Sequence, residues 1–193
     1  MKISNLAVAT LPVVALLGFS GQAGATALVG TVTADYLYPN ASTVFASSVL
    51  TVGSLFSCPG GSGSLCSPFA TPATILASGL SITINQQAGS FYTPAAFNGL
   101  RFSGLTFDDG STVTGFTLVT NLAGLTLSDV SSTSASIAYN GEGSSFQNAP
   151  YSITLNLITS GAVPEPATWG MMIAGMAVVG AAVRRRKVAV TFA

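Results

Sequence analysis

The sequence predicts an all-β protein, an antiparallel β-sandwich or jelly roll, with an N-terminal signal helix before it and a C-terminal transmembrane helix after it. Three observations lead to this fold class. Short runs through the middle of the chain alternate apolar with polar residues, which is the period of a half-buried strand. Asn-Gly, Asp-Gly and proline-containing turns separate these runs. An uncharged apolar segment, lying outside the alternating pattern, is found near each end of the chain.

The strands are expected within residues 28–162, which we treat as one exported domain. Residues 79–85 show the clearest pattern, because Leu80, Ile82 and Ile84 alternate with small polar residues. Comparable runs rich in β-branched and aromatic residues cover 28–38, 100–107, 112–120, 125–127, 135–139 and 151–158. Roughly eight short strands without an intervening helix suit a sandwich or jelly roll.

The connections between strands also carry predictions. Gly104 shifts the phase of the alternation within 100–107, which suggests a β-bulge. Residues 108–111, Asp-Asp-Gly-Ser, resemble a hairpin turn, because Asp-Gly tolerates the positive φ that tight hairpins require. The stretch 58–72 is expected to be the longest loop.

Charge is scarce and unevenly distributed. Charged residues make up 6% of the chain, no histidine is present, and the mean hydropathy is +0.62, whereas a soluble domain carries about 25% charged residues. Between residues 28 and 162 the only cation is Arg101, against the acids Asp35, Asp108, Asp109, Asp129 and Glu142. Binding to a phosphate backbone needs clustered Lys and Arg, so nucleic acid is not an expected partner.

Residues 1–27 have the three parts of a signal peptide. Lys2 precedes an apolar run at 6–19, and small residues follow it. Ala25 and Ala27 each end a small-x-small triplet, so we expect cleavage after one of them by signal peptidase, following passage through the Sec translocon. An uncleaved anchor is the less favoured alternative, because the apolar run is short for a membrane span.

Cys58 and Cys66 are the only cysteines. In the oxidising compartment that export implies, two cysteines this close across a glycine-rich segment predict a disulfide-closed loop. A zinc site would need two further ligands, and the chain offers no histidine. We therefore expect neither a metal nor any other cofactor.

Residues 163–193 form a tail with three successive parts. Pro164-Glu165-Pro166 is extended, residues 167–183 are an uncharged apolar helix that begins close to Trp169, and a basic cluster follows. That cluster consists of Arg184, Arg185, Arg186 and Lys187. By the positive-inside rule it stays in the cytoplasm, so Pro-Glu-Pro faces outward just beyond the inner membrane.

The order of these three parts at the C-terminus resembles the PEP-CTERM sorting signal, in its Pro-Glu-Pro-x-x-Trp-Ala form. The chain departs from the pattern at Gly170, where relatives have alanine, and in residues 188–193, which continue past the basic cluster. The resemblance implies recognition of Pro164, Glu165 and Pro166 by an exosortase, a membrane cysteine protease that would cut near the motif. It also implies a membrane-anchored precursor, transient contact with the inner membrane, and delivery to the cell surface or the extracellular matrix.

A catalytic role for the exported domain is not expected. Without histidine, Ser-His-Asp and Cys-His mechanisms are excluded in their ordinary forms. Paired carboxylates could support glycoside hydrolysis, but the candidates lie beside turn-forming residues that already account for them. Those candidates are Asp108, Asp109, Asp129 and Glu142.

Three interpretations of the domain remain open. The favoured one is a non-enzymatic surface or matrix protein that associates with exopolysaccharide or with itself. A lectin-like module is the second, and a carboxylate-based hydrolase is the third. Five tyrosines could offer stacking faces to sugars, although filling the core of the sandwich explains them more simply. These are Tyr36, Tyr38, Tyr92, Tyr139 and Tyr151.

Overall fold

The computed structural model describes residues 26–60, 65–161 and 166–184. These residues contain ten strands, one short 3₁₀ helix (Leu127–Asp129) and one α-helix, α1 (Pro166–Arg184). The strands are β1 (Thr31–Leu37), β2 (Val44–Thr51), β3 (Phe56–Cys58), β4 (Ala73–Ser78), β5 (Ser81–Gln86), β6 (Gly99–Ser103), β7 (Val113–Thr120), β8 (Val130–Thr133), β9 (Ser136–Asn140) and β10 (Tyr151–Thr159).

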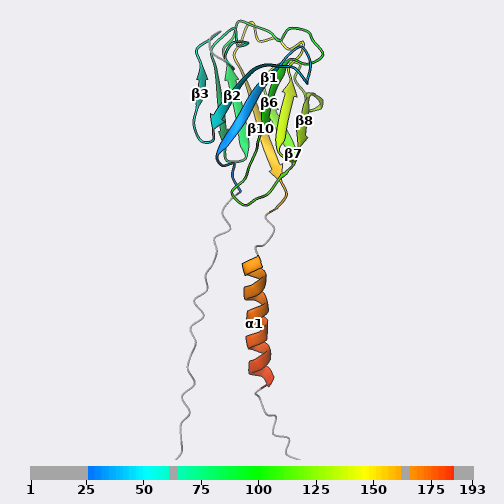
Figure 1. Cartoon of the computed structure of the whole chain (residues 1–193). Coiled ribbons are helices and arrows are strands. Elements are labelled where there is room, and N and C mark those ends of the chain that lie inside the picture. Colours follow the sequence, from blue (N-terminus) through cyan, green and yellow to red (C-terminus); the bar gives the residue numbers. More distant parts are fainter. Residues whose placement is uncertain (1–25, 61–64, 162–165, 185–193) are drawn as a thin grey trace, which may run out of the picture.

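The strands form two five-stranded sheets packed face to face, which confirms the predicted sandwich (Figure 1). One sheet has the order β2-β1-β6-β9-β8, and the other has the order β3-β4-β5-β10-β7. Every neighbouring pair is antiparallel. The chain changes sheets after β2, β5, β6, β7 and β9, so β9 completes the first sheet and β10 completes the second.

The core lies between the two sheets and follows the alternation seen in the sequence. In β5, Ile82 and Ile84 are fully buried, and in β10 the same is true of Ile153 and Leu155. The facing sheet contributes Phe102, also with no exposed surface. Side chains from the two inner faces thus meet in one apolar layer, as aligned sandwiches require.

Several expectations about individual elements were wrong. β2, β3, β4 and β8 were not predicted as strands, and residues 125–127 lead into the 3₁₀ helix instead of forming a strand. β6 ends at Ser103, and Gly104 lies past its end with φ of 74°, so the phase slip marks the end of a strand and not a bulge within one. Residues 108–111 do not make a hairpin, because β6 and β7 lie in different sheets.

The predicted disulfide is present between Cys58 and Cys66, whose Cα atoms are 5.2 Å apart. Cys58 ends β3, and no strand occurs in the described part of the loop between it and Ala73, the first residue of β4. The two cysteines are 1% and 6% exposed and belong to the main core. The bridge therefore attaches its loop to the sandwich interior as well as closing it.

The N-terminal and C-terminal residues of the sandwich domain both form hydrogen bonds with the segment between β6 and β7. Ala27 accepts a hydrogen bond at its carbonyl from the backbone N–H of Asp108, at 3.0 Å. After the last strand, Ser160 donates its N–H to the carbonyl of Thr112, at 2.9 Å. Figure 1 shows the chain entering and leaving the sandwich at the same end. One connection therefore fixes both chain ends.

The helix expected at 167–183 is present as α1. Within the described residues, however, no helix has both the length and the apolar character that crossing a membrane demands. The helical part of the expectation is thus confirmed, while its membrane-spanning part is not. Of the predicted signal peptide, residues 1–27, the first 25 residues lie outside the described residues.

Candidate functional sites

Helix α1 begins at Pro166. Proline is well tolerated in the first turn of a helix, because the backbone N–H groups there make no hydrogen bond within the helix. Its large apolar side chains that the structure describes are all exposed: Met171, Met172, Ile173, Met176, Val178 and Val179. Arg184 is its last residue. Trp169 lies within the helical backbone, whereas Pro164, Glu165, Arg185, Arg186 and Lys187 lie outside the described residues.

The described part of the chain is thus a β-sandwich followed by a C-terminal helix with exposed apolar side chains. A family model described as the PEP-CTERM protein-sorting motif matches residues 162–187, the segment singled out by the sequence. The chain carries this motif and is accordingly an exosortase substrate. The motif implies export, exosortase processing and sorting to the cell surface. Neither a curated protein nor a solved structure gives a significant match to the chain.

The acids Asp108 and Asp109 bind the start of the domain. The hydroxyl of Thr26 donates to Asp109 Oδ2 at 2.5 Å, and the N–H of Ala27 donates to Asp108 Oδ1 at 3.0 Å. Ser111 donates its N–H to Asp109 Oδ1 at 2.9 Å. The bond from Thr26, followed by those from Ser111, lowers the pKa of Asp109. Both carboxylates therefore have structural partners.

The other two candidate acids are not brought together with this pair. Asp129 accepts from the N–H and the hydroxyl of Thr126, at 2.8 and 2.7 Å, and so caps the 3₁₀ helix. Glu142 is exposed. In the part of the chain that the structure describes, no cluster of three or more Cys, Asp or Glu side chains could hold a metal ion.

Three of the five tyrosines form a buried hydrogen-bonded chain. Tyr92 lies 2.9 Å from Tyr139 and 2.6 Å from Tyr151, measured between hydroxyl oxygens, and Tyr151 donates to Gln86 Oε1 at 2.7 Å. Burial raises the pKa of all three hydroxyls well above the usual value. These rings pack in the core and cannot stack on a sugar, which confirms the simpler interpretation for Tyr92, Tyr139 and Tyr151.

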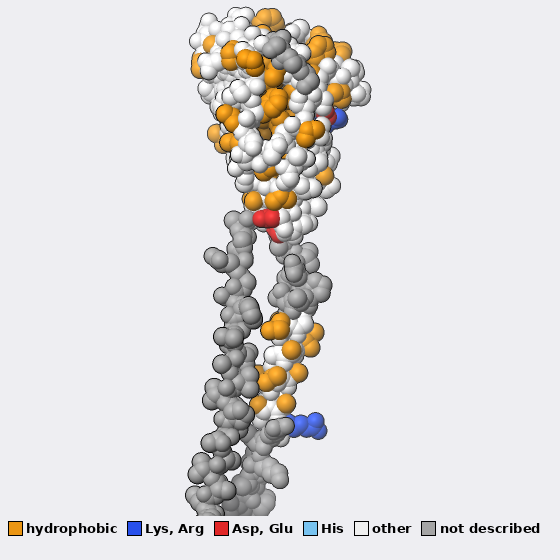
Figure 2. All heavy atoms as spheres, turned by 60° about the vertical axis from the view of Figure 1, so that its left-hand side comes forward, with side chains coloured by type: hydrophobic (Ala, Val, Ile, Leu, Met, Phe, Trp, Pro, Cys, Tyr) orange, Lys and Arg blue, Asp and Glu red, His pale blue; other side chains and the backbone are white. Residues whose placement is uncertain are grey.

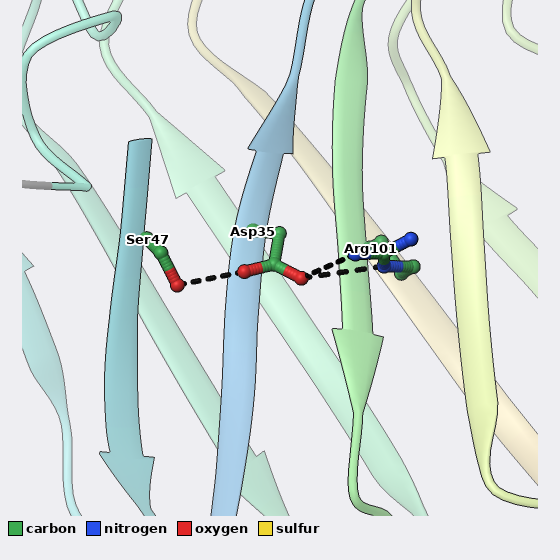
Figure 3. Close-up of polar contacts among 3 residues, drawn as sticks. All are labelled: Asp35, Ser47 and Arg101. Atoms are coloured by element: carbon green, nitrogen blue, oxygen red, sulfur yellow. Dashed lines mark hydrogen bonds and ion pairs between the residues drawn. The ribbon is translucent and has the colours of Figure 1, made fainter. Parts of the chain in front are cut away.

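A charged contact that the sequence did not suggest joins three strands of the first sheet (Figure 3). Arg101 on β6 lies 2.7 Å from Asp35 on β1, measured from Nη2 to Oδ2, and Ser47 on β2 donates to Oδ1 at 2.7 Å. Asp35 is only 6% exposed. The partners lie far apart in sequence and meet through strand register, since Asp35 pairs with both Ser47 and Arg101. The contact satisfies a buried carboxylate and aligns the strands.

The remaining two tyrosines border an open hollow. Its described lining consists of Tyr36, Tyr38, Phe45, Ser67, Pro68, Thr93 and Asn98. Phe45 lies where the register between β1 and β2 shifts, because Tyr36 pairs with Ala46 while Leu37 pairs with Val44. Such a bulge re-aims the side chain of the extra residue. The sequence analysis named the two tyrosines but missed Phe45 and Asn98.

Proposed function

We propose that this chain is an exported, non-enzymatic surface or matrix protein, whose sandwich is the cargo and whose tail is the sorting signal. The observation that supports this proposal most strongly is the PEP-CTERM match at residues 162–187. In the sandwich, the four aspartates have structural partners. The hydrolase alternative receives no support from the geometry. Asp108 and Asp109 bind the first residues of the domain, and Asp129 caps a 3₁₀ helix.

Contact with the inner membrane belongs to this proposal. The run 167–183 carries no charge, and the described apolar side chains of α1 are exposed. The basic residues at 184–187 would hold the C-terminal end of the tail in the cytoplasm. In the precursor the tail would thus hold the sandwich at the outer side of the membrane until the exosortase cuts near Pro-Glu-Pro.

Signal cleavage after Ala25 is favoured over cleavage after Ala27. The contacts of Thr26 with Asp109 and of Ala27 with Asp108 belong to the folded domain. Cleavage after Ala25 keeps both contacts, whereas cleavage after Ala27 removes them. The intact mass of the exported protein separates the two sites, and a mature chain that starts at Leu28 would contradict our choice.

Self-association is supported by a sheet edge that no strand of the described chain extends. β7 ends its sheet, and among the described residues no strand pairs with its outer side. It contains neither charge nor proline, the two devices that usually protect an edge from pairing. Its Val119 is 63% exposed. Introducing a lysine by Val119→Lys should shift an oligomer toward monomer in size-exclusion chromatography, and a wild-type protein that stays monomeric at high concentration would refute self-association.

The sorting proposal is tested by replacing Glu165 with alanine. We expect the Glu165→Ala precursor to keep its tail in cells that contain an exosortase, while the wild-type precursor is shortened. Glu142→Ala is the matched control, because it removes an exposed carboxylate from the sandwich and should leave processing unchanged. The masses of the cell-associated and released proteins give the answer. Identical processing of wild type and Glu165→Ala would overturn the proposal.

A carbohydrate-binding role is the second candidate. One observation favours it, namely the hollow that Tyr38, Phe45 and Asn98 line.

A further inference from the structure

The hollow beside the end of β1 has a volume of about 290 Å³. Pockets that bind small ligands begin at about 300 Å³, so its size suits one small ring. None of the seven residues that line it is an acidic or basic residue. In the view of Figure 2, hydrophobic side chains are spread over the sandwich among polar ones, and the few charged side chains lie at its margin and lower end. The hollow is therefore aromatic and polar without being charged.

Its aromatic wall is a phenyl ring that is fixed in place while open to solvent. Phe45 is 59% exposed. Its ring meets Tyr38 edge-to-face, with centroids 6.3 Å apart and planes at 89°, and meets Tyr36 at 6.5 Å and 65°. Edge-to-face contacts of this kind orient the rings relative to one another, and Phe45 stays more than half exposed despite them. An exposed and oriented face is what stacking on a ligand requires.

Its polar wall is a buried side-chain amide. Asn98 is 3% exposed; its Oδ1 accepts from the Tyr36 hydroxyl at 2.5 Å, and its Nδ2 donates to the carbonyl of Thr93 at 2.8 Å. The backbone N–H of Asn98 donates to Asn140 Oδ1, which fixes the residue further. An amide side chain has two donor hydrogens and two acceptor lone pairs. One donor and one acceptor of Asn98 therefore remain after these bonds are made.

The third side of the hollow is held by the disulfide. Ser67 and Pro68 follow Cys66, which is bonded to Cys58 and buried in the core. The next residue, Phe69, packs edge-on against Tyr36, with ring centroids 6.0 Å apart. All three walls are thus anchored to the core. A site formed in advance loses little conformational entropy when a ligand binds.

We propose that this hollow binds one uncharged pyranose ring of a polysaccharide. A pyranose has an apolar C–H face, which matches the exposed Phe45 and the half-buried Tyr38 beside it, and hydroxyl groups at its edge. A hydroxyl is both donor and acceptor, and so it fits the remaining donor and acceptor of Asn98. Anionic sugars do not fit, because the only cation of the domain, Arg101, is paired with Asp35. This inference goes beyond the sorting function and does not depend on it.

The test is a titration of the full chain, purified in detergent micelles, with neutral hexasaccharides of glucose, mannose and galactose. A site for one ring should give a dissociation constant on the order of 1 mM. Changes in NMR chemical shifts during the titration measure it. At least one neutral hexasaccharide should bind, and hexagalacturonate should not. Absence of binding by all three neutral probes, or stronger binding of hexagalacturonate, would overturn the proposal.

Variants of β2 locate the site. Phe45→Ala should weaken binding about tenfold, because it removes the aromatic ring on which the sugar stacks. Phe45→Trp keeps an aromatic ring and should therefore keep the affinity. Val49→Ala is the matched control, because Val49 lies on the same strand, is 64% exposed and does not line the hollow. Thermal unfolding checks that Phe45→Ala is folded. Equal affinity of Phe45→Ala and wild type would contradict the assignment, and the result is independent of whether Glu165→Ala alters sorting.

Discussion

Arg101 donates two hydrogen bonds to the same carboxylate oxygen of Asp35, from Nη2 at 2.7 Å and from Nε at 3.3 Å. The other oxygen accepts from Ser47 at 2.7 Å. The carboxylate is buried and the guanidinium is about one-third exposed. Asp35 lies on the second strand of its sheet, between the strands of its two partners. The pair therefore acts as a cross-strand connection in a sheet that has no other cation.

Removing the carboxylate should destabilise the sandwich more than removing the hydroxyl that binds it. We expect Asp35→Ala to lower the free energy of unfolding by about 2 kcal/mol, because it breaks charge-assisted bonds and leaves Arg101 without its partner. Ser47→Ala removes one bond and should cost about 1 kcal/mol. Urea unfolding of the two variants measures both values. An Asp35→Ala protein as stable as wild type would show that the pair aligns the strands without stabilising the fold.

The sequence predicted the strands whose inward residues are large, and missed those whose pattern is made of small ones. β5 and β10 were found through their isoleucines and leucines. β4 buries Ala73, Ile75 and Ala77, and alanine gives little contrast with the serine and threonine around it. β2 was missed because serines stand at its centre and a bulge breaks its alternation.

The site residues show the same division between local and long-range information. The disulfide and the sorting tail depend on residues close together in sequence, and both were predicted. The hollow depends on Phe45 and Asn98, which only the bulge in β2 and the packing of distant loops bring near Tyr36. Gly141 illustrates the difference. Asn140-Gly141 is one of the Asn-Gly pairs that predict turns, but Gly141 also makes room for the ring of Tyr92, since a Cβ there would lie 2.9 Å from that ring.

Reduction of the disulfide should destabilise the whole domain. The bridge closes a short loop, with a sequence separation of 8, for which chain entropy alone predicts a loss of about 2.5 kcal/mol. Both cysteines are also part of the core, so the double variant Cys58→Ala/Cys66→Ala should be at least this much less stable. Thermal unfolding with and without a reductant measures the effect. A reductant should leave the unfolding temperature of the double variant unchanged.

Stability should decrease in acid partly through Asp109. Its pKa is lowered in the folded protein by the bond from Thr26 and then by those from Ser111. A lowered carboxyl pKa stabilises the fold above the ordinary value for aspartate, about 3.9, and this contribution is lost as the pH falls through the folded-state pKa. The unfolding temperature of Asp109→Asn should therefore fall less than that of wild type between about pH 5 and about pH 3. Glu142→Gln controls for the loss of one negative charge, and equal slopes in wild type and Asp109→Asn would exclude this role of Asp109.

The tyrosine chain has a defined direction, which makes its members unequal. Tyr151 donates its proton to Gln86, so in the 2.6 Å contact Tyr92 must be the donor to Tyr151. The proton of Tyr92 is then used, and Tyr139 must donate to Tyr92. Each hydroxyl has only one proton to give. Donation therefore runs from Tyr139 through Tyr92 and Tyr151 to Gln86.

Removing the first hydroxyl of this chain should cost less than removing an inner one. Tyr139→Phe deletes one bond but leaves the Tyr92 proton bound to Tyr151, so we expect a loss of about 1 kcal/mol. Tyr151→Phe leaves both the Tyr92 proton and Gln86 Oε1 without a partner in the core, and should cost about 2 to 3 kcal/mol. Urea unfolding of both variants measures the difference, and equal losses would contradict the direction of donation.

Burial of the three tyrosine hydroxyls also predicts that the fold is sensitive to alkali. Since the folded-state pKa values of Tyr92, Tyr139 and Tyr151 are raised, the unfolded chain ionises first as the pH rises above about 10. The stability that the neutral hydroxyls contribute is complete below that pH and is lost above it. Wild type should therefore unfold cooperatively in alkali, with phenolate absorbance from these three rings appearing together with the loss of β-structure. Tyr151→Phe has one such group fewer and should lose stability less steeply with pH. Phenolate absorbance from all five tyrosines in a protein that stays folded would show that the core admits hydroxide, and would contradict the buried chain.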